Sequence, residues 1–163
     1  MESLTHVHPI TPLVFWTPVI LWFLYEGVVT DKMSIFSFIG VGFFSMLVWT
    51  FTEYFLHRFV FHYNAKSRFG KYIIFLFHGI HHDDPGDKTR LVMPPVPAVI
   101  IVGGLYLFFQ LIIPEVFLNT FMGQFLIGYL IYDYIHYATH HFPMKNKVGR
   151  FLKKWHLQHH HIK

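Results

Sequence analysis

Long apolar segments with histidine clusters at their ends are the feature that most constrains this fold. The segments run over about 9–29, 35–62, 92–113 and 116–141. Each is longer than the ~18 apolar residues that mark a membrane-spanning helix. Only 13% of the residues are charged, against ~25% in soluble domains. A soluble all-α core is the alternative, but runs of this length disfavour it. We therefore expect an all-α integral membrane protein with four transmembrane helices.

Basic residues predict the orientation of these segments. Five Lys and Arg residues lie in 63–91 and six follow the fourth segment, whereas the 31–34 turn holds one. By the positive-inside rule, 63–91 and 142–163 face the cytoplasm. The basic side chains would contact anionic headgroups and not nucleic acid. We expect residues 1–163 to form a single domain in which these two parts make a helical cytoplasmic cap.

The cap should contain two helices that lie at the membrane surface. The apolar stretch 72–77 is too short to span a bilayer, so it predicts an interfacial helix. Residues 147–161 predict a basic, amphipathic surface helix. The second and fourth apolar segments also end at the cytoplasmic side, so this topology gathers all the histidine clusters there.

Ten of the 14 histidines form four clusters, and these are the candidate metal ligands. They are His57 and His62; His78, His81 and His82; His136 and His140; and His156, His159 and His160. Spacings of three and four residues put imidazoles on one face of a helix. The chain has no cysteine, so a metal site must use nitrogen and oxygen ligands. A single zinc ion needs about four ligands, so ten histidines predict a polyhistidine site with two metal ions.

An all-imidazole shell suits Zn, Cu, Fe or Ni. A paired redox metal with open positions can reduce O2 and attack an unactivated C–H bond. The apolar surroundings favour a long-chain lipid as the substrate.

Two carboxylates are predicted to accept hydrogen bonds from the ligand imidazoles and so to hold them in orientation. Glu53 lies one helical turn before His57, and Asp133 lies three residues before His136. Metal-bound imidazoles usually donate their second N–H to a carboxylate or carbonyl. Four histidines are expected outside the ligand set, and they are His6, His8, His141 and His161. Of these, His6 and His8 are expected in a loose, solvated N-terminus.

At these residues the chain resembles a known family. The matching stretches are FTEYFLHRFVFH, HGIHHDDPGDKTRLVMPPVPA, GYLIYDYIHYATH and LKKWHLQHH, which cover about 51–160. They resemble the membrane fatty acid hydroxylase superfamily, which includes sterol desaturases, and within it the fatty acid 2-hydroxylase branch that acts on sphingolipid acyl chains. The resemblance implies that the ten clustered histidines bind two iron ions, with zinc as another occupant. It also implies O2-dependent hydroxylation at C2 of an acyl chain.

The resemblance also implies an electron donor. Eukaryotic members often carry an N-terminal cytochrome b5-type domain, and nothing here resembles one. We therefore expect a separate cytochrome b5-like or ferredoxin-type carrier, docked on the basic cytoplasmic face. The sequence stops soon after the fourth cluster, whereas family members usually continue beyond it. We therefore expect either a short natural form of the protein or a truncated one. The expected location is the bacterial inner membrane, or the endoplasmic reticulum in a eukaryote.

Two other functions remain open at this point. One is a carotenoid hydroxylase or sterol desaturase-like oxidase, which mass spectrometry of the lipid products would distinguish. The other is a non-enzymatic membrane carrier of metal or heme. Membrane cytochromes place paired histidines near the bilayer centre, whereas these clusters lie at the segment ends, and a Soret band would identify a heme carrier.

Overall fold

The computed structural model describes residues 6–161, without the side chains of Phe77 and His161. Within that range every regular element is a helix. The helices are α1 (Thr11–Tyr25), α2 (Ile35–Phe55), α3 (Arg68–Ile74), α4 (Ile80–Asp83), α5 (Pro95–Phe109), α6 (Glu115–His141) and α7 (Lys147–His161). Three π-helical turns extend them, and these are η2 (Glu26–Thr30), η3 (Leu56–Phe61) and η4 (Phe75–Gly79).

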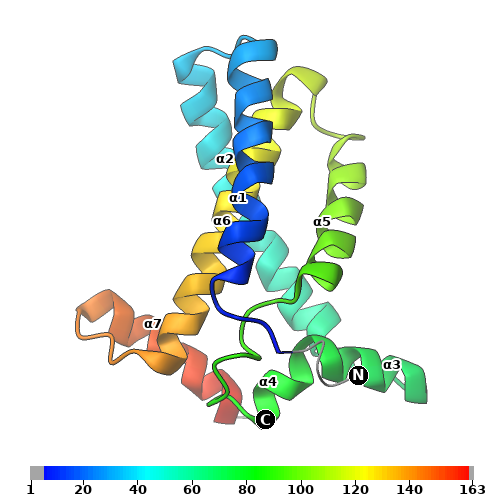
Figure 1. Ribbon diagram of the computed structural model, residues 1–163, viewed down its shortest axis with the longest axis vertical. Helices are drawn as coiled ribbons and strands as arrows, with labels where there is room; N and C mark the ends of the chain where they lie inside the picture. The colour runs from blue at the N-terminus through cyan, green and yellow to red at the C-terminus, as the bar shows by residue number, and fades with distance from the viewer. Residues whose placement is uncertain (1–5, 162–163) are drawn as a thin grey trace.

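Four helices stand upright and the others spread at one end of them (Figure 1). α1, α2, α5 and α6 form the upright bundle, with α6 packed against both α1 and α2. α3 and α7 point sideways at the lower end, on opposite sides of the bundle. The result is a long apolar body with a wider foot, which consists of Arg68–Asp83 (α3, η4 and α4) and Lys147–His161 (α7).

α6 forms the core of the bundle because its apolar side chains are enclosed on several sides. Phe121, Met122, Phe125 and Leu126 are at most 1% exposed. The ring of Phe109, from the end of α5, lies 4.8 Å from that of Phe121 and 5.3 Å from that of Phe125. Such close aromatic pairs add to the free energy gained from burial.

Small residues allow α6 to approach its neighbours closely. A Cβ built on Gly128 would lie 2.9 Å from Cγ of Trp49 on α2. A Cβ built on Gly27 would overlap the side chain of Thr120. Close backbone approach at small residues is typical of helix packing in membranes.

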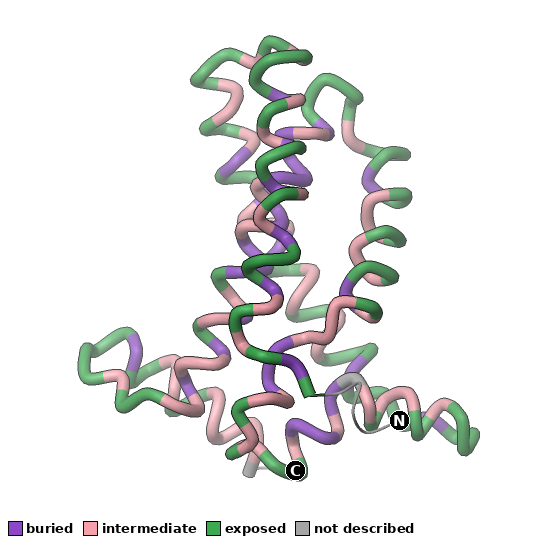
Figure 2. The backbone as a smooth tube through the Cα atoms, in the orientation of Figure 1, coloured by how far each residue is buried: buried purple, intermediate pink, exposed green. Residues whose placement is uncertain are grey.

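The outward faces of the bundle are exposed (Figure 2), and many of the exposed side chains are large and apolar. Phe36, Phe43 and Phe51 on α2 are 84%, 69% and 72% exposed. Monomeric soluble proteins rarely expose large contiguous apolar surfaces. Two helical stretches, Thr11–Thr30 and Ile35–Phe61, are long and apolar enough to cross a membrane. The protein is therefore a membrane protein, and two such helices lie within residues 6–161.

The other two predicted spans differ from expectation in length or polarity. The segment predicted over 92–113 is helical only over Pro95–Phe109, since prolines precede it and residues 110–113 form a turn. Fifteen residues of helix extend about 22 Å, which is less than the ~30 Å of a bilayer core. α6 has 27 residues but includes polar side chains, such as Asn119, which donates a hydrogen bond to Asp31 at 3.0 Å.

The foot contains the two surface helices. α7 has the predicted bounds, while the predicted 72–77 helix is part of a longer unit, Arg68–Asp83, made of α3, η4 and α4. The start of the described chain is held against the loop that follows this unit, which differs from the expected loose N-terminus. Val7 is buried, and its N–H donates to the carbonyl of Thr89 at 2.8 Å.

Candidate metal centre

A π-helical turn brings the first two candidate ligands together. His57 and His62 are five residues apart, a spacing that an α-helix would place on different faces. In η3 the backbone N–H of His62 donates to the carbonyl of His57 at 3.3 Å, which is the i→i+5 bond of a π-helix. The two imidazole rings therefore lie 5.1 Å apart.

The first group of histidines comes from three elements. It contains His57, His62, His78 and His159, whose nitrogens lie within 4.8 Å of one another. Nε2 of His159, on α7, lies 2.9 Å from Nε2 of His57 and 3.0 Å from Nε2 of His62. A single imidazole nitrogen facing two others indicates convergence on a shared point.

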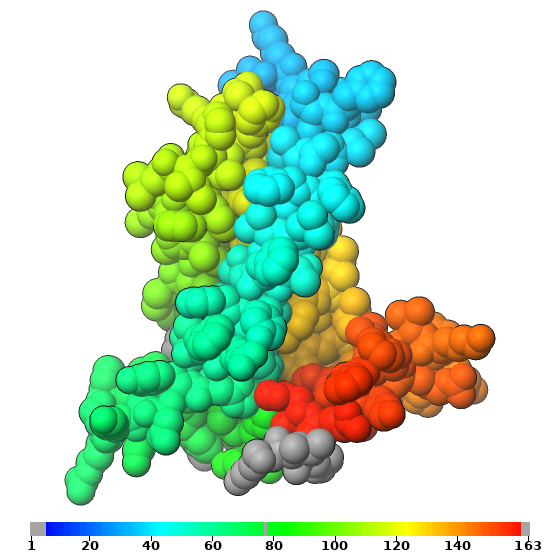
Figure 3. Space-filling model, turned by 180° about the vertical axis from the view of Figure 1, so that it is seen from behind, coloured from blue at the N-terminus to red at the C-terminus, as the bar shows by residue number. Residues whose placement is uncertain are grey.

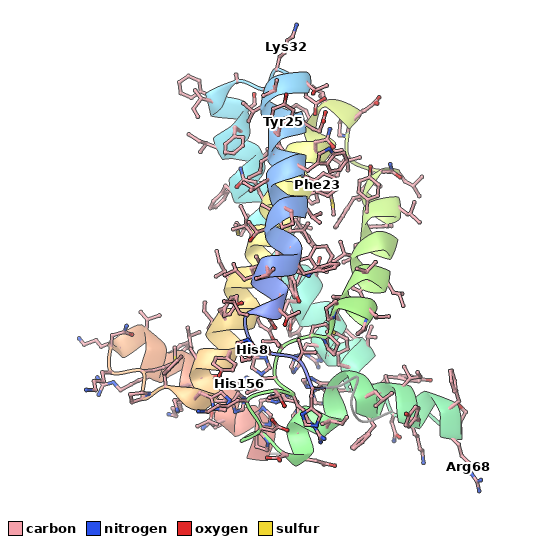
Figure 4. The ribbon with its side chains drawn as sticks, in the orientation of Figure 1. His8, Phe23, Tyr25, Lys32, Arg68 and His156 are labelled. Atoms are coloured by element: carbon pink, nitrogen blue, oxygen red, sulfur yellow. The ribbon has the colours of Figure 1, made fainter. Side chains whose placement is uncertain are left out.

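The second group comes from α4, α6 and α7. It contains His81, His136, His140, His156 and His160. Nε2 of His136 lies 3.0 Å from that of His81, and Nε2 of His140 lies 2.6 Å from that of His156. Figure 4 shows His156 in the foot, at the opposite end of the bundle from Tyr25 and Lys32.

His82 lies between the two groups. Its Nε2 is 2.8 Å from that of His78 in the first group, and its ring is 4.2 Å from that of His160 in the second. The structure thus gathers all ten histidines that the sequence singled out. His141 stays outside, with its ring 4.6 Å from that of Tyr137, and the side chain of His161 is outside the described residues.

Burial lowers the pKa of several of these imidazoles and so keeps them uncharged. Loss of hydration, followed by repulsion between neighbouring imidazoles, lowers the pKa of His81 and His156 to about 2 and that of His82 to about 3. The same causes lower the pKa of His159 to about 4. A neutral imidazole has a free nitrogen lone pair, which is the form that binds a metal ion.

The spacing of the nitrogens fits metal ions. Two imidazole nitrogens bound to one ion at 2.0–2.1 Å lie roughly 3 Å apart at right-angled to tetrahedral bond angles. The closest Nε2–Nε2 distances within the groups are 2.6–3.1 Å. The donor set is all nitrogen, which suits first-row transition metals.

The two predicted carboxylates have different partners. Oε1 of Glu53 lies 3.4 Å from Nδ1 of His57, on the ring edge away from the nitrogen cluster. Asp133 is 5% exposed and accepts a hydrogen bond from the backbone N–H of Met93. Its Oδ2 has no hydrogen-bond partner among the described residues. Glu53 therefore contacts a candidate ligand, whereas Asp133 joins α6 to the loop before α5.

Tyr132 was not singled out in the sequence although it lies beside the site. Its hydroxyl donates a hydrogen bond to Glu53, and its ring is 5.9 Å from that of His136. The signal that points to it is its position four residues before His136, one turn away on the same helix face.

Two cavities end at the histidines. An inner cavity of about 80 Å³ lies between α2, α5 and α6 and reaches His57, His78, His81 and His136. An outer groove of about 970 Å³ lies between α2, α6 and α7 and reaches His57, His62, His136, His156 and His159. Apolar side chains line most of the inner cavity, whereas apolar and polar side chains both line the outer groove. Figure 3 shows the corner of the surface where α2, α6 and α7 meet.

Comparison with known proteins identifies the family. The family model for fatty acid hydroxylases matches residues 41–163. This chain belongs to the fatty acid hydroxylase family. That assignment confirms the resemblance seen in the sequence.

Relatives and a solved structure agree with the family. Rat fatty acid 2-hydroxylase is 36% identical over 90% of this chain and 45% of its own length. An Arabidopsis thaliana dihydroceramide fatty acyl 2-hydroxylase is 36% identical over 90% of this chain and 62% of its own. The chain thus spans about half the length of such relatives. A structure of full-length scs7p, with only the hydroxylase domain visible, matches 98% of this chain and 60% of its own at 34% identity and a TM-score of 0.89.

Proposed function

We propose that this fatty acid hydroxylase family member hydroxylates C2 of a fatty acyl chain, either free or in a ceramide-type lipid. The observation that carries the proposal is the convergence of ten histidines, seven of which line one or both of two cavities. The 2-hydroxylase relatives support the position of attack. In the overall reaction one C2–H bond is replaced by C2–OH. One oxygen atom of O2 enters the lipid, and the other leaves as water with two electrons and two protons.

The proposed ligands would hold two iron ions, with zinc as another occupant. One set is His81, His136, His140, His156 and His160, and the other is His57, His62, His78 and His159, with His82 between them. When bound, iron supplies the redox chemistry that activates O2. Glu53 would hold His57 in one orientation by accepting from its Nδ1–H, which leaves Nε2 free for the metal.

The protein itself contributes to the reaction by positioning the acyl chain and excluding water. Apolar walls around the centre keep an acyl chain extended and dry. Trp49 and Tyr132 line both cavities next to His57 and His136, so they would restrict which carbon lies beside the centre. Fixed geometry of this kind lowers the entropic part of the barrier.

The proposed membrane placement follows from charge and exposed apolar surface. α1, α2 and α6 would span the bilayer, α5 would cross it together with the residues that flank this shorter helix, and the foot would form a cap on the cytoplasmic side, where most basic residues lie. A cytochrome b5-like or ferredoxin-type carrier would deliver electrons to this basic face. The membrane would be the bacterial inner membrane, or the endoplasmic reticulum in a eukaryotic cell.

The test is turnover by the protein in lipid nanodiscs, supplied with an electron-transfer system and ¹⁸O2. We expect about two iron ions per chain and a 2-hydroxy acyl lipid that carries one ¹⁸O atom. Hydroxylation of carotenoids alone, or iron bound as heme, would contradict the proposal.

A further inference from the structure

The wall of the inner cavity contains two buried polar atoms without a partner. Oδ2 of Asp133 and Nδ1 of His81 belong to side chains that line this cavity, and neither atom has a hydrogen-bond partner among the described residues. The two residues are 5% and 4% exposed. Buried polar groups are almost always hydrogen-bonded, either to protein or to ordered water. Because residues 6–161 supply no partner for either atom, ordered water is the partner that fits.

The size and chemistry of the cavity agree with hydration. A buried water molecule needs about 10–15 Å³ of free space and roughly two to four polar partners, and the inner cavity offers about 80 Å³. Asp133 provides an acceptor, whereas His81 provides an Nδ1–H donor, because its Nε2 faces the other histidines. Tyr129, one helical turn before Asp133, also lines the cavity. Water held there would connect Asp133 with a candidate ligand.

Polar side chains in the loop after α4 mark where this water can enter. Arg90 lines the inner cavity, and its side chain is 22% exposed. Its Nε lies 3.3 Å from Oδ2 of Asp87, and its Nη2 lies 2.8 Å from Nε2 of His6. The side chain of His6 is itself 44% exposed. A continuous set of polar groups thus leads from solvent to the cavity.

The proposed reaction needs such a path. Each turnover consumes two protons as one oxygen atom leaves as water, and these protons must reach a centre that is kept dry on the side of the acyl chain. The nitrogens that bind the metal ions must be deprotonated, so they cannot carry protons to it. Oδ2 of Asp133 has free lone pairs, so it can take a proton from one water molecule and give it to another.

We propose that the inner cavity is a hydrated proton path, in which Oδ2 of Asp133 takes protons from water that enters past Arg90 and passes them to water beside His81. This inference rests on the proposed hydroxylation. A proton leaves an outer water as an O–H bond forms at Asp133, and that bond breaks as the proton moves to an inner water. Asp133 is therefore unchanged after each transfer. The hydrogen bond from the backbone N–H of Met93 holds its carboxylate in place.

Radiolytic labelling tests the hydration without turnover. X-ray pulses convert ordered water into hydroxyl radicals, which oxidise the side chains that this water contacts. In the zinc-loaded protein in nanodiscs, Tyr129 should be labelled several-fold faster than Phe125, because Tyr129 lines the cavity and Phe125 lines neither cavity. Ala98→Leu, which fills the cavity from α5, should slow the labelling of Tyr129. Equal labelling of the two rings, or no change in Ala98→Leu, would overturn the proposal.

Proton delivery is tested by Asp133→Asn in the iron-loaded protein. Asparagine keeps the size of the side chain and an acceptor for Met93, but it cannot carry a proton. We expect kcat to fall roughly 100-fold, with KM and metal per chain little changed. The solvent isotope effect on kcat should rise, because proton transfer becomes rate-limiting. Asp133→Glu should recover part of kcat.

The matched control is Asp31→Asn, because Asp31 bonds to α6 through Asn119 and lines neither cavity. It should change neither kcat nor the isotope effect. In Asp133→Asn, an unaltered isotope effect, or a loss of metal that matches the loss of kcat, would show a structural role and overturn the proposal. Absence of any 2-hydroxy product in the unmodified protein would instead contradict the proposed function, since the labelling result does not depend on turnover.

Discussion

α2 and α6 pack against each other in two different ways along their lengths. In the upper half, the ring of Phe44 on α2 lies 6.0 Å from that of Phe121 on α6, and the side chain of Gln124 donates to the backbone carbonyl of Phe38 at 3.3 Å. Toward the foot, Glu53, Tyr132 and the histidines separate the two helices, and a cavity opens on each side. The closed half fixes the angle between the helices, which allows the open half to hold ligands and space. One half of these two helices thus contributes mainly to stability, and the other half holds the candidate ligands.

The largest effects are expected from the open half, at the candidate ligands. His81→Ala and His159→Ala, one in each group, should abolish hydroxylation and lower the metal content, because each leaves a group one nitrogen short. Metal per chain and 2-hydroxy lipid are measured together. His8→Ala is the control, since His8 is exposed and outside both groups. Full activity in both ligand variants would refute the assignment.

A smaller loss is expected at Glu53. Glu53→Ala removes the oxygen next to Nδ1 of His57, so metal affinity or activity should fall by about 10–100-fold. Asp133→Asn is the informative comparison, because Asp133 bonds to the backbone of Met93. A chelator competition measures metal affinity, and we expect it to change little in Asp133→Asn. An equal loss of affinity in both variants would contradict the separate roles described above.

The contact between Gly128 and Trp49, where the closed half meets the open half, should affect stability more than metal binding, because neither residue is a candidate ligand. Gly128→Ala places a Cβ against Trp49, and such overpacking costs about 1–3 kcal/mol. Thermal unfolding in nanodiscs should therefore show a lower Tm, with metal per chain retained. Gly40→Ala on α2 is the matched control: its Cβ meets nothing within 4 Å, and alanine favours helix by up to about 1 kcal/mol. If both variants unfold alike, the close approach at Gly128 is not what holds the helices.

The smallest effect is expected at the start of the described chain. His6 contacts Thr89 and Arg90, and Arg90 lines the inner cavity. His6→Ala should loosen residues 87–92 by no more than about 1 kcal/mol, because the contacts are exposed to solvent. Hydrogen exchange of those amides should quicken while metal content stays unchanged. Slower or unaltered exchange would show that this contact does not restrain the loop.

Much of this architecture was predictable from the residues. α6 begins within one residue of the predicted segment and α7 has the predicted bounds, because apolar runs and polar breaks define helix ends. The ten histidines were predictable as one site because charge and segment order place all four clusters at one end. The family was recognisable from the same stretches.

Other features depend on tertiary packing and escaped sequence reasoning. α2 and α5 are apolar on nearly every side, so their periodicity does not reveal which face meets α6. The two cavities that Trp49 and Tyr132 both line could therefore not be anticipated. Asp133 was expected near His136, but the loop before α5 supplies a backbone N–H at Met93 that competes for it. The shortening of α5 depends on prolines at its start and a turn at its end.

The π-helical turn at His57 and His62 has a consequence for the rest of the chain. One additional residue in a turn advances the angular phase of everything that follows by about 100°, the rotation of one residue in an α-helix. The chain after Phe61 therefore leaves α2 in a different direction from that of an uninterrupted helix; a non-helical stretch over 63–67 follows, and α3 then lies sideways (Figure 1). Deleting one residue between His57 and His62 would keep the pair on one helix face, yet it would turn the 63–91 segment, with three other candidate ligands, away from the centre.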